Sequence, residues 1–342
     1  MTQKITLKWQ TTARPHSMNT MHDTVKRIHE KTNGRVTIEP YGVGGVVPEF
    51  DIFPGVQSGK IDIGYTVSGY GKSAGLLPHS SVGELPIWPS GQAGCAFVKA
   101  VLDKYVRSEM EALGVTPLFY EINFACDFGY FVPPYVTDLW CNKMYNSLED
   151  VKGARIVSQC WTTGQALKAI GVIPVEIPYA EVPAALSNDT VDGALVASVI
   201  MFIDNCQDPL KCCVRIGFPQ SEDAFTFMNK KIYDSLPANI QNIIIEEIGN
   251  YWRANNRWAI AKQSNAIKDE RIKAGKLKII ELTPSEQAFC KQQWEENLVD
   301  VWVKKQVAAG FKNARAYVDD LKKIKADILA SGIPQCEEEP LR

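Results

Sequence analysis

Several motifs that mark common classes of enzyme and cofactor are missing from this sequence. The chain has no GxxxxGK[ST] phosphate-binding loop and no GxGxxG motif after a strand, which argues against nucleotide-dependent enzymes. Its nine cysteines and four histidines show no CxxC or Cys/His metal-ligand spacing, so we expect no metal site. No set of nucleophile, base and orienting group can be assembled. We therefore expect that the protein is not an enzyme and needs no cofactor.

An excess of charge of one sign and long apolar runs are also missing. The net charge is −2, and Lys and Arg are scattered, so we expect no nucleic-acid partner. No apolar run reaches the length of a transmembrane helix, so we expect no direct membrane insertion. Residues 1–12 lack the apolar core of a signal peptide. Either the protein is cytoplasmic or a signal peptide has been removed, and the sequence leaves both open.

The hydrophobic and polar patterns predict an α/β protein. The chain has 342 residues with 45% hydrophobic and 22% charged residues, which is ordinary for a globular protein of two domains. Residues 5–69 alternate strand, helix, strand, helix and strand, as in a parallel sheet. Residues 152–178 repeat the strand–loop–helix–strand order. The helical pattern over residues 236–275 is long enough to serve two lobes.

Five segments, in this order, resemble motifs of one family of binding proteins. They are similar to the extracytoplasmic solute-binding proteins of tripartite ATP-independent periplasmic (TRAP) transporters. The segments are HEKTNGRVTIEPYG (29–42), GVQSGKIDIGYTVSGY (55–70), SLEDVKGARIV (147–157), GVIPVEIPYAEVPAALSNDTVDG (171–193) and FMNKKIYDSLPANIQNIIIEEI (227–248).

The resemblance implies a two-lobed periplasmic-binding-protein-like α/β fold, with a cleft between the lobes and a long helix spanning both. It also implies export to the periplasm, removal of a signal peptide, and the TRAP membrane subunits as partners. We expect lobe I to hold residues 1–124 and about 213–250, and lobe II to hold 125–212 and about 251–310. Residues 311–342 are expected to form a C-terminal helix and tail.

Two positions depart from the family's pattern. The family usually has an Arg in the strand after its DlkG motif, and this Arg clamps the ligand's carboxylate. The motif corresponds to DVKG (150–153) here, and the place of the Arg falls on Val157. Arg155 lies two residues earlier on the same strand face, so Arg155 or Arg14 is an alternative clamp. Where the family has an Asn that contacts the ligand, this chain has Val196. An unpaired carboxylate is costly to bury, so we expect no dicarboxylate bound in the usual way.

The predicted site lies at strand ends and in the loops after them. Aromatic rings and valines supply contact area there, and amides supply orientation, although Trp161 is equally suited to packing inside its lobe. We predict capture of a small organic molecule that is neutral, aromatic or largely apolar. One alternative is an organic acid held by a non-standard Arg, and another is a ligand-presenting component of a membrane sensor. The candidate ligand-binding residues are Tyr70, Glu121, Asn123, Phe124, Arg155, Val157, Gln159, Trp161, Val196 and Phe218.

Three cysteines lie close together in the run CQDPLKCC. In an exported protein this short Pro-containing loop predicts a disulfide between Cys206 and either Cys212 or Cys213. The alternative is that they are buried thiols which pack as small apolar residues.

Overall fold

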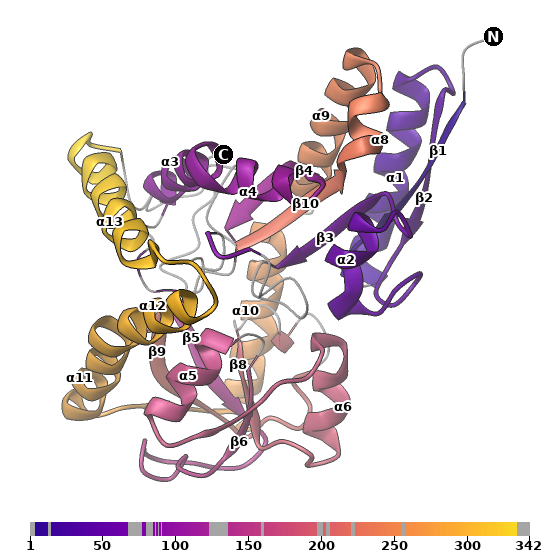
Figure 1. Ribbon diagram of the computed structural model, residues 1–342. Coiled ribbons are helices and arrows are strands. Elements are labelled where there is room, and N and C mark those ends of the chain that lie inside the picture. Colours follow the sequence, from indigo (N-terminus) through magenta and orange to yellow (C-terminus); the bar gives the residue numbers. More distant parts are fainter. Residues whose placement is uncertain are drawn as a thin grey trace.

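The computed structural model contains two β-sheets with helices packed around them, and the sheets lie in separate parts of the molecule (Figure 1). The expected two-lobed α/β class is confirmed. Within the described residues no helix is long and apolar enough to cross a membrane. The structure describes residues 4–12, 15–67, 77–79, 85, 87, 89, 91–122, 136–158, 161–196, 201–202, 206–219, 223–254 and 257–333.

The first sheet forms the centre of lobe I. The connected strands β1, β2 and β3 run parallel, as predicted for residues 5–69, whereas β10 runs antiparallel between β3 and β4. The strand order is β2-β1-β3-β10-β4. The strands are β1 (Ile5–Gln10), β2 (Val36–Tyr41), β3 (Ile63–Val67), β4 (Val115–Ile122) and β10 (Asp223–Asn229).

The second sheet forms the centre of lobe II. Its strand order is β11-β9-β5-β8-β6-β7, and β5 is antiparallel to both of its neighbours. β6, β7 and β8 are parallel to one another, as are β9 and β11. The strands are β5 (Val136–Cys141), β6 (Arg155–Val157), β7 (Ile173–Val175), β8 (Gly193–Val196), β9 (Cys212–Pro219) and β11 (Lys278–Glu281).

Helices cover both sheets, and short 3-10 or π segments join several of them (Figure 1). Those before β5 are α1 (Pro15–Lys31), η1 (Glu49–Asp51), α2 (Ile52–Gln57), α3 (Gly91–Val101), η4 (Leu102–Val106) and α4 (Arg107–Ala112). Those between β6 and β11 are α5 (Trp161–Ala169), η5 (Tyr179–Glu181), α6 (Val182–Ser187), α8 (Lys230–Ser235), α9 (Ala238–Ala254) and α10 (Arg257–Lys273). The C-terminal ones are α11 (Pro284–Gln292), η6 (Gln293–Asn297), α12 (Leu298–Ala308) and α13 (Ala314–Ala330).

Local sequence signals mark several helix ends. Asn33 and Gly34 follow α1 with positive φ angles of 52° and 73°, a backbone conformation that commonly terminates helices. These two residues are therefore a local signal that ends α1. Thr283 and Glu286 form a capping box at the start of α11, in which each side chain accepts a hydrogen bond from the other residue's backbone N–H.

The helices α9 and α10 lie on different lobes. In α9, Ile244 packs in the core of the first sheet with Leu7, whereas Ile267 of α10 packs against the core of the second sheet near Leu277. The long helical pattern therefore serves both lobes through α9 and α10.

The structure differs from the expected lobe boundaries at two places, the return of the chain to lobe I and the C-terminal helix. Lobe I was expected to resume near residue 213, but β9 lies between β11 and β5, because its backbone hydrogen-bonds to both. The chain therefore returns to lobe I only at β10. The C-terminal helix α13 lies against α3 of lobe I, and the Tyr317 hydroxyl donates to the His79 carbonyl at 2.5 Å.

The predicted disulfide of Cys206 is wrong for this structure. Cys206, Cys212 and Cys213 all carry free thiols in it. Cys206 and Cys213 pack in one buried cluster, whereas Cys212 packs in another on the opposite face of the second sheet. Successive side chains of a strand point to opposite faces, so Cys212 is turned away from Cys206.

Candidate ligand-binding site

The two valines that replace the family's polar residues lie at one edge of the second sheet. Val157 ends β6 and Val196 ends β8, and these strands run parallel with Val157 opposite Ala194. The carboxyl ends of parallel strands form the usual binding edge of an α/β sheet. Val157 is 0% exposed and Val196 is 2% exposed. These strand ends therefore carry apolar side chains, packed in a buried cluster of lobe II, where the family pattern has Arg and Asn.

Phe218 lies near the same edge, because Thr137 of β5 pairs with Phe218 while Asp138 pairs with Val196. Its side chain belongs to a different cluster from the two valines. The Phe218 ring meets the Trp294 ring edge to face, with 5.0 Å between centroids. The structure therefore brings Phe218 to the predicted edge but packs its ring into the core.

The turn from β6 into α5 is held by buried hydroxyl groups. The Ser158 and Thr163 hydroxyls are 2.9 Å apart, and the Ser158 N–H donates to the Val175 carbonyl at 2.9 Å. Gly164 allows this close approach, because a Cβ built there would lie 3.3 Å from the Ser158 Oγ. These contacts fix the direction in which α5, beginning at Trp161, leaves the edge of the sheet.

Trp161 is partly exposed at the first position of α5, and a cation lies over its ring. The Lys305 Nζ is 4.0 Å from the centroid of the indole. An ammonium over an aromatic face is attracted by the ring's quadrupole. Lys305 lies on α12, which contacts α5, so this pair joins the sheet edge to the C-terminal helices.

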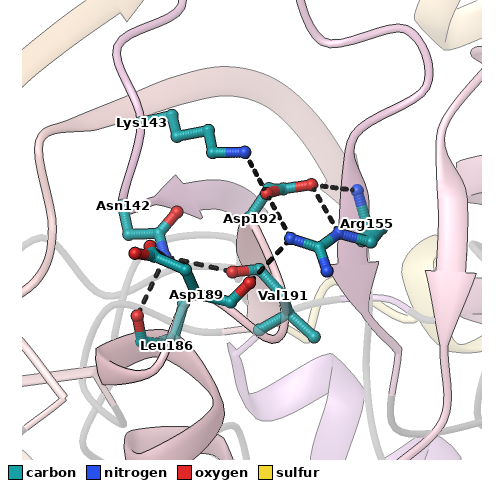
Figure 2. A network of polar contacts seen from close by, with 7 residues as sticks. All are labelled: Asn142, Lys143, Arg155, Leu186, Asp189, Val191 and Asp192. Carbon is teal, nitrogen blue, oxygen red and sulfur yellow. Dashed lines mark hydrogen bonds and ion pairs between the residues drawn. The ribbon is translucent and has the colours of Figure 1, made fainter.

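Arg155, at the opposite end of β6 from Val157, binds a carboxylate of the chain itself (Figure 2). Its Nε donates to the Asp192 Oδ2 at 3.1 Å and its Nη2 to the Oδ1 at 2.9 Å. The Arg155 backbone N–H also donates to Oδ2 at 2.8 Å, and Lys143 Nζ lies 2.6 Å from Oδ1. The Arg155 guanidinium, followed by the Lys143 ammonium, holds the pKa of Asp192 well below its usual range despite partial burial.

The same network shapes the turn that leads into β8. The Asn142 side-chain amide donates to the carbonyls of Leu186 and Val191 at 2.9 and 3.0 Å, and to Asp189 Oδ1 at 3.1 Å (Figure 2). The Arg155 Nη2 donates to the Asp189 carbonyl at 2.7 Å. The VDG motif (residues 191–193) is therefore part of an anchored turn, and Arg155 helps to hold that turn in place.

Of the remaining predicted residues, the structure describes only the backbone of Glu121. Glu121 pairs with Ala224 through the backbone of β4 and β10, but its side chain is not described. Sequence reasoning missed Lys305, because nothing in a single sequence links it to a ring at position 161. Tyr70, Asn123, Phe124 and Gln159, together with the alternative clamp Arg14, lie outside the described residues.

The chain belongs to the family described as bacterial extracellular solute-binding protein, family 7, whose model matches residues 11–305. Proteins of this family bind solutes and are not enzymes. Within the described residues, no three His, Cys, Asp or Glu side chains gather in a way that would hold a metal ion.

Solved structures share the fold over nearly the whole chain. One is a marine metagenome TRAP solute-binding protein, specific for aromatic acid ligands, in complex with metahydroxyphenylacetate. It has a TM-score of 0.76 and 19% identity, and the match covers 95% of this chain and 99% of that chain. Another is a TRAP solute-binding protein of Rhodoferax ferrireducens with copurified benzoate, at a TM-score of 0.74 and 20% identity, covering 96% and 99% of the chains. At such identities the likeness shows the fold alone.

A curated relative gives a shorter match at higher identity. A monocarboxylate 2-oxoacid-binding periplasmic protein of Nostoc sp. strain PCC 7120 is 29% identical over 199 residues. The match covers 55% of this chain and 50% of that protein, so the chain matches half the length of this relative.

Proposed function

We propose that this protein captures a small organic solute outside the cytoplasmic membrane and passes it, unchanged, to the membrane subunits of a TRAP transporter. Family membership and the two-lobed fold support this proposal. The solute binds between the lobes and favours their closed arrangement, because it contacts both lobes only when they are closed.

We propose further that the solute has an aromatic or largely apolar body and a single carboxylate. The observation that carries this proposal is the Lys305 ammonium over the Trp161 ring, near strand ends that carry the apolar side chains of Val157 and Val196. Val157 and Val196 match an apolar body and offer nothing to a second carboxylate. Lys305 supplies the positive charge, because Arg155 is held by Asp192.

Names of the related proteins support the same ligand class. Two structural neighbours are named for aromatic acid ligands or copurified benzoate, and the curated relative is named for monocarboxylate 2-oxoacids. The aromatic body of the solute is the one expected from the sequence, and its carboxylate corresponds to the organic-acid alternative. Lys305 recognises this carboxylate, in place of Arg155 or Arg14.

The first experiment is a calorimetric titration with matched small molecules. We expect benzoate and 3-hydroxybenzoate to bind at least tenfold more tightly than succinate or neutral benzamide. Mass spectrometry of solute released from natively expressed protein gives the ligand independently. Micromolar binding of succinate, or equal affinity for benzamide and benzoate, would contradict the proposed ligand class.

The second experiment removes the charge of Lys305 and keeps its chain length. Lys305→Met should weaken binding of the aromatic acid at least tenfold, because a hydrogen bond to a charged group contributes about 1.5–3 kcal/mol. The matched control is Lys304→Met, because Lys304 is the exposed neighbour on the same helix. If both variants bind like the parent, the Trp161–Lys305 pair is packing between helices.

A further inference from the structure

Two buried cysteines lie opposite each other in the second sheet, at the end away from Val157 and Val196. Cys141, the last residue of β5, pairs in register with Cys212, the first residue of β9. Both thiols are free in this structure and lie in the same buried cluster, and both residues are 0% exposed. Directly opposed residues of antiparallel strands have Cα atoms about 4.5–5.5 Å apart, within the range that a disulfide spans.

The surroundings hold the two thiols close together on one face of the sheet. The Cys141 thiol lies near the Leu139 carbonyl oxygen at 3.6 Å, and Cys141 and Cys212 are close enough that each shifts the pKa of the other. The Tyr145 N–H donates to the Cys212 Sγ at 3.4 Å, and this Sγ lies 3.2 Å from the Lys143 carbonyl oxygen. On the other side, Gly193 of β8 leaves room for Cys141, because a Cβ there would lie 3.0 Å from its Sγ. The pair is thus confined between neighbouring strands on one face of the sheet.

We propose that Cys141 and Cys212 form a disulfide that links β5 to β9 when the protein folds in the presence of a disulfide oxidant. The Cys212 thiolate attacks the oxidant's S–S bond, forming a mixed disulfide and releasing one reduced thiol. The Cys141 sulfur, after losing its proton, displaces the second thiol and forms the bond. Two cysteine thiols lose two electrons, and the oxidant's disulfide gains them as two thiols.

The environment makes Cys212 the attacking sulfur. The Cys141 thiol, helped by the Tyr145 N–H, lowers the pKa of Cys212 to about 7 although burial opposes this. The contact with Cys212 and complete burial raise the pKa of Cys141 well above its usual range. A thiolate is the reactive form, so the first attack belongs to Cys212. Oxidation therefore takes place late in folding, when β5 and β9 are already paired as in the folded protein but the oxidant can still reach Cys212.

The crosslink would enclose residues 142–211, which include β6, α5 and β8. It would therefore close a loop around both valines and Trp161 at the proposed binding edge. A disulfide that closes a long loop restricts the unfolded chain, and for a protein of this size the melting temperature should rise by about 5 °C.

The test is to refold the reduced protein with excess oxidised glutathione, alkylate the free thiols and map peptides without reduction. Trypsin leaves Cys141 with Cys126 in residues 108–143, and Cys212 with Cys213 in residues 212–215. The double variant Cys126→Ala/Cys213→Ala removes both ambiguities and keeps the proposed pair. We expect these two peptides to be linked in the parent and in the double variant.

Single variants and heating complete the test. Cys141→Ala and Cys212→Ala should each lose the link and the rise in melting temperature. Unlinked Cys141 and Cys212 in the oxidised double variant would overturn the proposal, and this variant gives an answer even if a single variant fails to fold. A link that persists in parent-like yield in Cys141→Ala would also overturn it, because Cys126 would then be the partner. None of these readouts depends on which solute the protein binds.

Discussion

The guanidinium of Arg155 neutralises a carboxylate that the fold has buried. The Asp192 side chain is 6% exposed, and it accepts hydrogen bonds from the backbone and the side chain of Arg155. Removing one partner of such a pair leaves a charge that is costly to bury. Arg155 lies close to the family's clamp position in the sequence, but its charge stabilises the fold.

We predict that Arg155→Met lowers the free energy of unfolding by about 2 kcal/mol, because Asp192 loses a charged hydrogen-bond partner. Solute affinity should change less than twofold. Denaturant unfolding and calorimetry measure the two effects. The control is Lys152→Met, whose ion pair with Glu149 is exposed and should contribute less than about 1 kcal/mol. Unchanged stability with a tenfold loss of affinity would restore Arg155 as a ligand clamp.

Asp138 provides a prediction about pH. Burial raises its pKa to about 6, although the Gly217 N–H donates to its Oδ1 at 3.1 Å. Because the folded pKa lies above the ordinary value, the folded state binds the proton more tightly, and stability rises as the pH falls from about 6 toward 4. The parent should gain about 1 kcal/mol from Asp138 between pH 7 and pH 5. Asp138→Asn should lack this gain; the same pH slope in both proteins would exclude Asp138 as its source.

At the scale of elements, α13 is joined to the helices of lobe I by polar contacts as well as rings. The Asp320 carboxylate accepts from the Tyr105 hydroxyl at 2.6 Å and lies 2.7 Å from the Lys104 Nζ. The His79 ring stacks on Tyr105 and meets Tyr317 edge to face. α12, which precedes α13, contacts α5 of lobe II, so these two consecutive helices connect the lobes.

We predict that Asp320→Asn lowers the free energy of unfolding by about 1 kcal/mol, because two hydrogen-bonded contacts to η4 lose their negative partner. Asp319→Asn is the matched control, since Asp319 is the exposed neighbour on the same helix. Denaturant unfolding of both variants makes the comparison. Equal stability of the two variants would mean that the contacts of Asp320 contribute nothing measurable to holding α13 against lobe I.

At the scale of the whole molecule, each sheet has its own covering helices and several segments cross between them. The chain leaves lobe I after β4, returns between β9 and β10, and crosses again from α9 to α10 (Figure 1). Covalent connections at several places restrict the relative motion of two lobes more than a single linker would. This arrangement suits the hinge closure on which the proposed function depends.

Much of this architecture follows from the sequence alone. Period-two and helical hydrophobic patterns, Asn33–Gly34 and the five ordered segments predict an α/β protein of two lobes in a solute-binding family, because these signals are local. The same local reading shows that Val157 and Val196 replace the usual polar residues. It placed the return to lobe I too early, because only hydrogen bonding between strands decides to which sheet β9 belongs.

Contacts between residues far apart in the chain were decided by the tertiary structure. Arg155 binds Asp192, Lys305 lies over Trp161, and Cys212 faces Cys141 and not its near neighbour Cys206. The physical reason is the same in each case. A sequence determines which groups can pair, but strand register, sheet face and helix packing determine which of them come within a few ångströms of each other.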